Sequence, residues 1–346
     1  MNKANDKLTL KPKDATKKLL AVLTPRAKEV LSKRYGLEET AKRQTLEAIG
    51  GKYGITRERV RQIENAGLMA IKKSPAFTSM TPSFEELKTV LASHGGIVHE
   101  EEFLTTLAKD KSTQNHIHFL LVIGEAFSKL KEDDEFHHRW TVDAKLAEKV
   151  HDSIRNLCTN FNENDLVSEA ELITNFLTEL KDVVKDPRAA DFAKRWIVLS
   201  KRLSQNPLGE WGLASSPNVH MRGIRDYAFL VLRKHGSPMH FSEVAKQITK
   251  TFGKKAHPAT CHNELIKDSR FVLVGRGLYA LTEWGYSRGV VADVIKSVLK
   301  KNGALTKEEV INKVMKERYV KENTILVNLQ NSKYFKKDKQ GKYSLA

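Results

Sequence analysis

Side chains that can read the edges of base pairs lie close together between positions 56 and 62. Two arginines, a glutamate and a glutamine stand at i, i+4, i+1 and i+5, so in a helix they share one face. Arginine can donate two hydrogen bonds to guanine, glutamate can accept one from cytosine, and glutamine can pair with adenine. The pattern predicts contact with duplex DNA, and the alternative is an exposed helix whose mixed charge serves only solubility. The residues expected at DNA are Thr56, Arg57, Glu58, Arg59, Arg61 and Gln62.

To read bases, this face must lie at the N-terminal end of a helix that enters the major groove. The stretch 45–71 predicts two short helices joined by a tight turn, the second capped by Thr56. Three positions are expected to fix this helix-turn-helix. Gly50 allows a close helix crossing, Gly54 supplies the positive φ of the turn, and Val60 packs the second helix on the first.

Composition favours a polyanionic partner. The 346 residues carry 59 lysines and arginines against 42 acids, a net charge of +17. The charge is uneven: residues 1–80 hold 18 basic and 8 acidic side chains, residues 81–142 hold 6 and 11, and residues 289–346 hold 13 and 6. Cys158 and Cys261 lie far apart, which gives no sign of a disulfide framework or a zinc site. The apolar run 19–23 is too short to span a membrane, so we expect a cytoplasmic protein without membrane contact.

Four related strings divide the rest of the chain: IVHEEEF at 97, LVSEAEL at 166, PMHFSEV at 238 and ALTKEEV at 304. In each, a His or a small polar residue follows apolar residues, which signals the start of a helix. An aromatic residue closes each unit, at Trp140, Trp211, Tyr279 and Tyr343. Helices before and after each string, then two strand-like runs around a turn, predict a winged helix in every unit.

The expected fold class is therefore mainly α, a helix-turn-helix followed by four tandem winged-helix domains. We expect a flexible basic arm over residues 1–18 and a short linker near residues 78–83. The predicted domains are 19–77 for the helix-turn-helix and 82–142, 143–217, 220–287 and 289–346 for the winged helices.

The first module closely resembles region 4 of the sigma-70 type RNA polymerase sigma factors. LTPRAKEVLSKRYGL (23–37), TLEAIG and ITRERVRQIENAGLMAIKK carry the resemblance, which covers residues from about 20 to 75. It implies that Arg57, Glu58, Arg61 and Gln62 read a −35 promoter element. It also implies that the helix starting at Thr24-Pro25 helps to dock on the polymerase flap. The Gly50-Gly51 pair departs from the pattern and predicts a softer first helix.

The third winged unit resembles a second family. VLRKHGSPMHFSEVAKQI and DSRFVLVGRGLYALTEWG look like the HARE-HTH family, which includes the N-terminal domain of the RNA polymerase delta subunit. The other three units match this pattern more loosely. The resemblance implies a transcription or DNA-modification context more than a mechanism.

No residue pattern indicates an enzyme or a cofactor. The histidine pairs at 116 and 118 and at 137 and 138 do not share a helix face, so a metal site is not expected. The acidic run EDDE at 132–135 is interpreted as a solvated loop or a patch that docks on a basic surface. GRG at 275–277 lacks the helix and Lys-Ser/Thr of a phosphate loop.

Residues and resemblance together predict a nucleoid-associated bacterial transcription factor. Its expected partners are duplex promoter DNA and the RNA polymerase core. Nothing resembles the sigma region that captures the −10 strand, and the segment ahead of Leu23 is too short to hold it, so we expect an accessory factor. The alternatives are a polymerase- or protein-docking scaffold and a general nucleoid-type DNA-binding protein.

Overall fold

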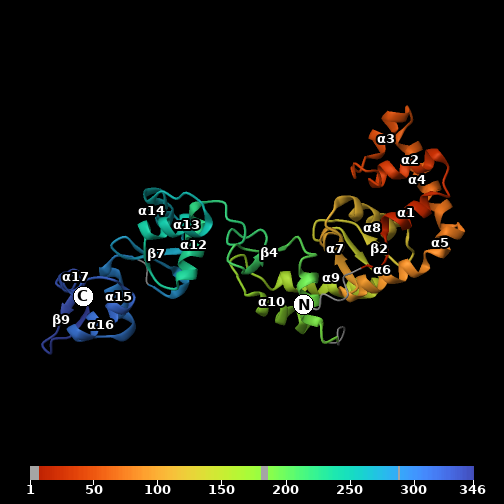
Figure 1. The fold of residues 1–346 in the computed structure, drawn as a ribbon. Helices are drawn as coiled ribbons and strands as arrows, with labels where there is room; N and C mark the ends of the chain where they lie inside the picture. The colour runs from red at the N-terminus through yellow and green to blue at the C-terminus, as the bar shows by residue number, and fades with distance from the viewer. Residues whose placement is uncertain (1–7, 181–185, 287–288) are drawn as a thin grey trace. The chain divides into compact units, whose positions relative to one another are not determined.

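The computed structural model describes residues 8–180, 186–286 and 289–346 (Figure 1). The chain divides into two compact units, Met1–Ser204 (unit 1) and Gln205–Ala346 (unit 2). Within the described ranges helices dominate, and the longest strand has five residues. The expected mainly α class with a helix-turn-helix is confirmed.

Five helices open unit 1, and local capping explains where three of them begin and end. Thr24, Thr45 and Thr56 each accept a backbone N–H from the first turn of the following helix. Gly36 and Gly54 end two of these helices in the left-handed conformation, with φ of 65° and 63°. The helices are α1 (Pro12–Leu20), α2 (Pro25–Tyr35), α3 (Leu46–Tyr53), α4 (Arg57–Lys72) and α5 (Pro75–Ser79).

A three-helix module with a small sheet follows in unit 1. Its sheet has the strand order β1-β3-β2, and all neighbours are antiparallel. The central strand places Trp140 opposite Val98 on one side and Lys129 on the other. The elements are α6 (Thr81–Ser93), β1 (Ile97–His99), α7 (Glu100–Leu107), α8 (Lys111–Ile123), β2 (Ser128–Leu130) and β3 (Arg139–Thr141).

Two expectations for the start of the chain are wrong. Residues 12–18, expected in a flexible arm, belong to α1, where Ala15 and Thr16 are buried; residues 1–7 lie outside the described residues. Residues 78–83, expected as a linker, belong largely to α5 and α6. The physical reason is a shared hydrophobic core: α1, α2 and α4 contribute Leu19, Leu31 and Ile71 to the same cluster as α6 and α8.

The next elements of unit 1 are α9 (Ala144–Thr159), α10 (Glu169–Glu179), α11 (Ala189–Ile197) and β4 (Leu203–Gln205). The acidic run at 132–135, which lies between β2 and β3, contacts basic residues of this segment. Glu135 pairs with Arg155 at 2.8 Å and with Arg202 at 3.3 Å, and Glu132 pairs with Lys201. The run is therefore docked on a basic surface within its own unit. The boundary between the two units falls inside β4.

Unit 2 begins at the end of β4 and continues with β5 (Trp211–Leu213). Its first three-helix module has the sheet order β6-β8-β7, and its second has a β9–β10 hairpin with a bridge from Leu305 to Tyr343. The first module comprises α12 (Ile224–His235), β6 (Met239–His240), α13 (Phe241–Phe252), α14 (Pro258–Lys267), β7 (Phe271–Gly275), β8 (Leu278–Leu281) and η1 (Thr282–Trp284). The second comprises α15 (Val291–Asn302), α16 (Lys307–Glu317), α17 (Glu322–Leu329), β9 (Phe335–Lys337) and β10 (Tyr343–Leu345).

The four related strings all start helices, as predicted. The capping side chain in each string accepts a backbone N–H from the first turn, and these residues are His99, Ser168, His240 and Thr306. The apolar residue shared by the strings is buried at Phe103, Leu172, Val244 and Val310. The closing aromatic residues lie in the strands β3, β5, β8 and β10. The division into four winged-helix domains with the stated boundaries stays a prediction.

Candidate nucleic-acid interface

The turn between α3 and α4 is fixed by the three positions expected to hold it. Val60 is fully buried in a small cluster with Val30 and Ile49, which ties α4 to α2 and α3. The N–H of Gly54 donates to the carbonyl of Gly50. A Cβ on Gly50 would lie 2.5 Å from the carbonyl oxygen of Ile55, so this position requires glycine because of the turn itself.

A second set of contacts holds α4 from behind. The hydroxyl of Tyr35 on α2 donates to the buried carboxylate of Glu64 on α4 at 2.9 Å. The guanidinium of Arg34 lies 3.6 Å from the same carboxylate. Tyr35 also packs edge to face on Phe119 of α8, with ring centroids 5.2 Å apart. The orientation of α4 is therefore coupled through α2 to the module that follows.

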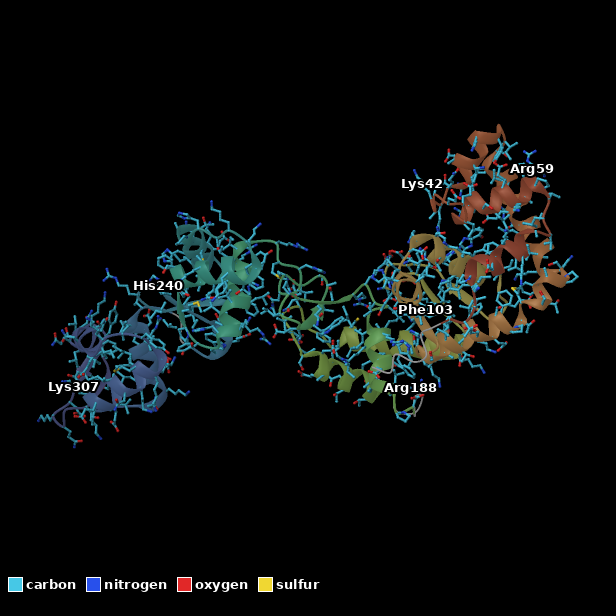
Figure 2. The ribbon with its side chains drawn as sticks, in the orientation of Figure 1. Lys42, Arg59, Phe103, Arg188, His240 and Lys307 are labelled. Carbon is cyan, nitrogen blue, oxygen red and sulfur yellow. The ribbon has the colours of Figure 1, made fainter. Side chains whose placement is uncertain are left out.

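All six residues expected at DNA are exposed at the N-terminal end of α4, and Figure 2 labels Arg59 among them. The buried residues of the helix lie on the opposite face: Val60, Glu64, Gly67 and Ile71. Within the part of the chain that the structure describes, no hydrogen bond or ion pair joins these six side chains to another module. The end of the helix is free to approach a duplex.

The exposed side chains are paired with one another. Arg61 donates from Nε and Nη2 to the two carboxylate oxygens of Glu58, at 2.9 and 2.7 Å. Arg59 donates from Nη1 to the amide oxygen of Gln62 at 3.0 Å. The hydrogen bond from Arg61 lowers the pKa of Glu58 and raises the pKa of Arg61. Glu58 therefore holds the Arg61 fork flat and fully charged in the free protein.

Thr56 has a structural role besides any contact with DNA. Its hydroxyl oxygen accepts the N–H of Arg59 at 3.2 Å and so caps α4. A neighbouring hollow was not predicted from the sequence, and it is lined by Arg34, Thr45, Leu46, Glu47 and Arg57. This hollow brings the capped end of α3 beside Arg57, and the N-cap threonine at 45 was the signal that could have indicated it.

Other chemistry finds little support in the geometry. Among the described residues, no group of three or more His, Cys, Asp or Glu side chains has an arrangement that could hold a metal ion. Cys158 and Cys261 are both buried, and burial raises the pKa of the Cys261 thiol to about 12. In the described ranges no helix is both long and apolar enough to cross a bilayer.

Two families match separate parts of the chain. Residues 19–73 match the family described as Sigma-70, region 4. Residues 224–284 match HARE-HTH, a family whose description names the HTH domain of ASXL and restriction endonuclease proteins. The first match contains the whole exposed face of α4, and the second runs from the start of α12 to the end of η1.

Several curated sigma factors are similar to the N-terminal segment. The principal sigma factor HrdD of Streptomyces coelicolor is 39% identical over 66 residues, 19% of this chain and 20% of that protein. SigA of Clostridium acetobutylicum is 42% identical over 60 residues, 17% and 16% of the two chains, and SigA of Nostoc is 46% identical over 55 residues, 16% and 14%. The chain thus spans a fifth or less of the length of these relatives. It joins a sigma-70 region 4 segment at residues 19–73 to a HARE-HTH segment at residues 224–284.

Proposed function

We propose that this chain is a DNA-binding transcription factor that reads a −35-like promoter element through α4. The observation that carries the proposal is the free, correctly ended reading face: Arg57, Glu58 and Arg61 project from the N-terminal turns of a helix whose other face is buried. The similarity of this segment to RNA polymerase sigma factors supports it.

The proposal includes association with the RNA polymerase core. The N-terminal half of α2 would dock on the flap, and its residues Thr24, Pro25, Arg26 and Lys28 are exposed. The contacts of α2 with α8 involve the other end of the helix, at Tyr35. Both surfaces can therefore be used at once, in the bacterial cytoplasm and at the nucleoid.

We further propose an accessory role rather than that of a complete sigma factor. The likeness to sigma factors is confined to one segment, which is a fifth or less of their length. An accessory factor of this kind binds upstream DNA and polymerase together and modulates initiation, and no enzymatic step is assigned to it.

The proposal is tested by selecting binding sites from random duplexes with the full chain, with and without core polymerase. We expect one enriched motif, with a preference that Arg57→Ala flattens at one position and a loss of affinity of roughly 10- to 100-fold. Arg26→Ala removes the same charge from α2 of the same module and is the matched control, which keeps the motif.

Two other outcomes would replace this function. Binding that ignores sequence across many duplexes would indicate a general nucleoid-type protein. Polymerase capture that survives Arg57→Ala and Arg61→Ala, without any selected DNA motif, would indicate a docking scaffold.

A further inference from the structure

Lysine residues gather in the hairpin that ends unit 2. Residues 336–342 contain four exposed lysines and one aspartate, a local charge of +3. The β9–β10 register places Lys337 opposite Tyr343 and Lys336 opposite Ser344. The buried Phe335, at the start of β9, anchors the hairpin in the core formed by α15, α16 and α17. The lysine hairpin is defined here as Lys336, Lys337, Lys339 and Lys342.

The charges of the lysine hairpin are not neutralised by nearby acids. In the ranges that the structure describes, none of the four ammonium groups forms an ion pair with a carboxylate. Asp338 serves the turn, because one of its oxygens accepts the backbone N–H groups of Gln340 at 2.9 Å and Lys342 at 2.8 Å. Glu309 lies within electrostatic reach of Lys342, but its carboxylate accepts the N–H of Thr306 at 2.8 Å.

The composition of the hairpin favours phosphates over a protein partner. Lysine is depleted in protein–protein interfaces, whereas unpaired ammonium groups displace the counterions of a nucleic acid. Single-stranded nucleic acid would require open aromatic faces for stacking. The two tyrosines beside the hairpin do not offer them, because Lys296 lies 3.6 Å from the ring centroid of Tyr334 and Lys337 lies 5.8 Å from that of Tyr343.

We propose that the lysine hairpin is a second DNA-contact surface, which binds the phosphate backbone of a duplex without reading its sequence. This goes beyond the proposed function, which places sequence reading in α4. The hairpin lies outside both family matches, so neither match assigns it a role. A backbone contact of this kind adds affinity and salt dependence but leaves the preferred motif unchanged.

The test measures binding of the full chain to a labelled duplex of random sequence over a range of salt concentrations. The hairpin variant carries Lys→Gln at all four hairpin positions, 336, 337, 339 and 342. We expect the slope of log affinity against log salt to become shallower by about 0.9 for each phosphate that is no longer neutralised, and so by roughly 3 to 4 in total. The control variant carries Lys→Gln at four exposed positions on α15 and α16 of the same module and keeps most of the slope: Lys300, Lys301, Lys307 (labelled in Figure 2) and Lys316.

A second variant tests the opposite direction. Asp338→Asn keeps an amide oxygen for the two backbone N–H groups and removes the negative charge of the turn. We expect tighter binding to the random duplex and a steeper salt slope. Equal slopes for the hairpin and control variants would overturn the proposal, as would a hairpin variant that keeps the wild-type slope or that loses only polymerase binding.

The outcome is separable from that of the proposed function. Arg57→Ala and Arg61→Ala alter the selected motif, whereas the hairpin variant alters binding to every duplex. A flattened salt slope with an intact motif supports the hairpin contact, and a lost motif with an intact slope overturns neither the hairpin proposal nor its measurement.

Discussion

Single residues at the start of α4 already form hydrogen bonds with one another in the free protein. Glu58 engages both sides of the Arg61 fork, and Gln62 engages Arg59. All four side chains are exposed, so water screens these pairs and base edges can replace them at small cost. A site of this kind is preorganised by local pairs and needs no support from another domain.

Arg61→Lys separates base reading from simple charge attraction. Lysine keeps the positive charge but lacks the planar fork that donates to guanine O6 and N7. We expect roughly 10- to 100-fold weaker binding to the selected motif, with an unchanged salt slope on random duplex. Fluorescence anisotropy on both duplexes measures this. If the Arg61→Lys variant selected the same motif as the wild type, Arg61 would contact only phosphate.

A buried histidine makes unit 1 sensitive to acid. Nε of Arg139 donates to Nε2 of His151 at 2.8 Å, so this nitrogen carries a lone pair and the ring is neutral. Burial, with the charges of Arg139 and Arg155, lowers the pKa of His151 to about 4. Below about pH 6.5 the unfolded chain gains a proton that the folded chain refuses. The stability is therefore complete above about pH 6.5 and declines toward about pH 4, by at most about 1.4 kcal/mol per pH unit.

His151→Gln tests this titration. The glutamine oxygen can still accept from Arg139, but the side chain does not titrate. We expect the free energy of unfolding of unit 1 to decline less between about pH 7 and about pH 5 than in the wild type, as measured by urea unfolding at each pH. His220→Gln, at an exposed position, is the control. Parallel pH profiles for the wild type and His151→Gln would contradict the assignment.

Among the elements, α2 and α8 form the joint that fixes the DNA-reading module on its neighbour. Asn115 of α8 is fully buried, and its amide donates to the carbonyls of Gly36 at 3.0 Å and Ala41 at 2.8 Å. Its oxygen accepts Nε of Arg43 at 2.9 Å. A Cβ on Gly36 would lie 2.6 Å from this amide nitrogen, so the glycine that ends α2 also admits Asn115. One side chain therefore joins two modules that are continuous in their core.

Asn115→Ala should loosen this joint. The substitution leaves two carbonyls and a guanidinium N–H without their buried partner, which costs on the order of 2–3 kcal/mol. We expect a lower urea midpoint for unit 1 and faster hydrogen exchange over residues 36–43 in the full chain. Asn156→Ala, at an exposed position on α9, should change the free energy of unfolding by less than about 0.5 kcal/mol. Similar exchange in both variants would show that the joint is not stabilised by this amide.

The whole molecule combines basic ends with an acidic middle. Residues 1–80 and 289–346 carry the excess of positive charge, and residues 81–142 carry the excess of negative charge. The acidic run at 132–135 uses part of its charge inside unit 1, through Arg155, Lys201 and Arg202. Two basic regions so far apart in the sequence fit a protein that holds DNA at more than one place.

Run-off transcription tests the function of the whole chain. With core polymerase alone, we expect no promoter-specific transcript from this chain. With a principal sigma factor present, we expect altered initiation at promoters that carry the selected motif, and the double variant Arg57→Ala, Arg61→Ala should abolish the effect. Efficient promoter-specific initiation by this chain with core polymerase would contradict the accessory role.

The sequence by itself determined the helix-turn-helix and the four repeated helix starts. Thr56 and Gly54 act within a few residues of themselves, and so do the caps His99, Ser168, His240 and Thr306, so their effects can be inferred from local spacing. The exposure of the reading face follows from the same periodicity.

Only the tertiary structure decided which segments share a core. The lysine-rich stretch at 11–18 has too few apolar residues to predict a buried helix, yet α1 packs against α8, about 100 residues away. The pairing of Asn115 with Gly36 and of the acidic run with Arg202 likewise joins residues far apart in the chain. Such contacts depend on complementary surfaces brought together by folding, and no local pattern specifies them.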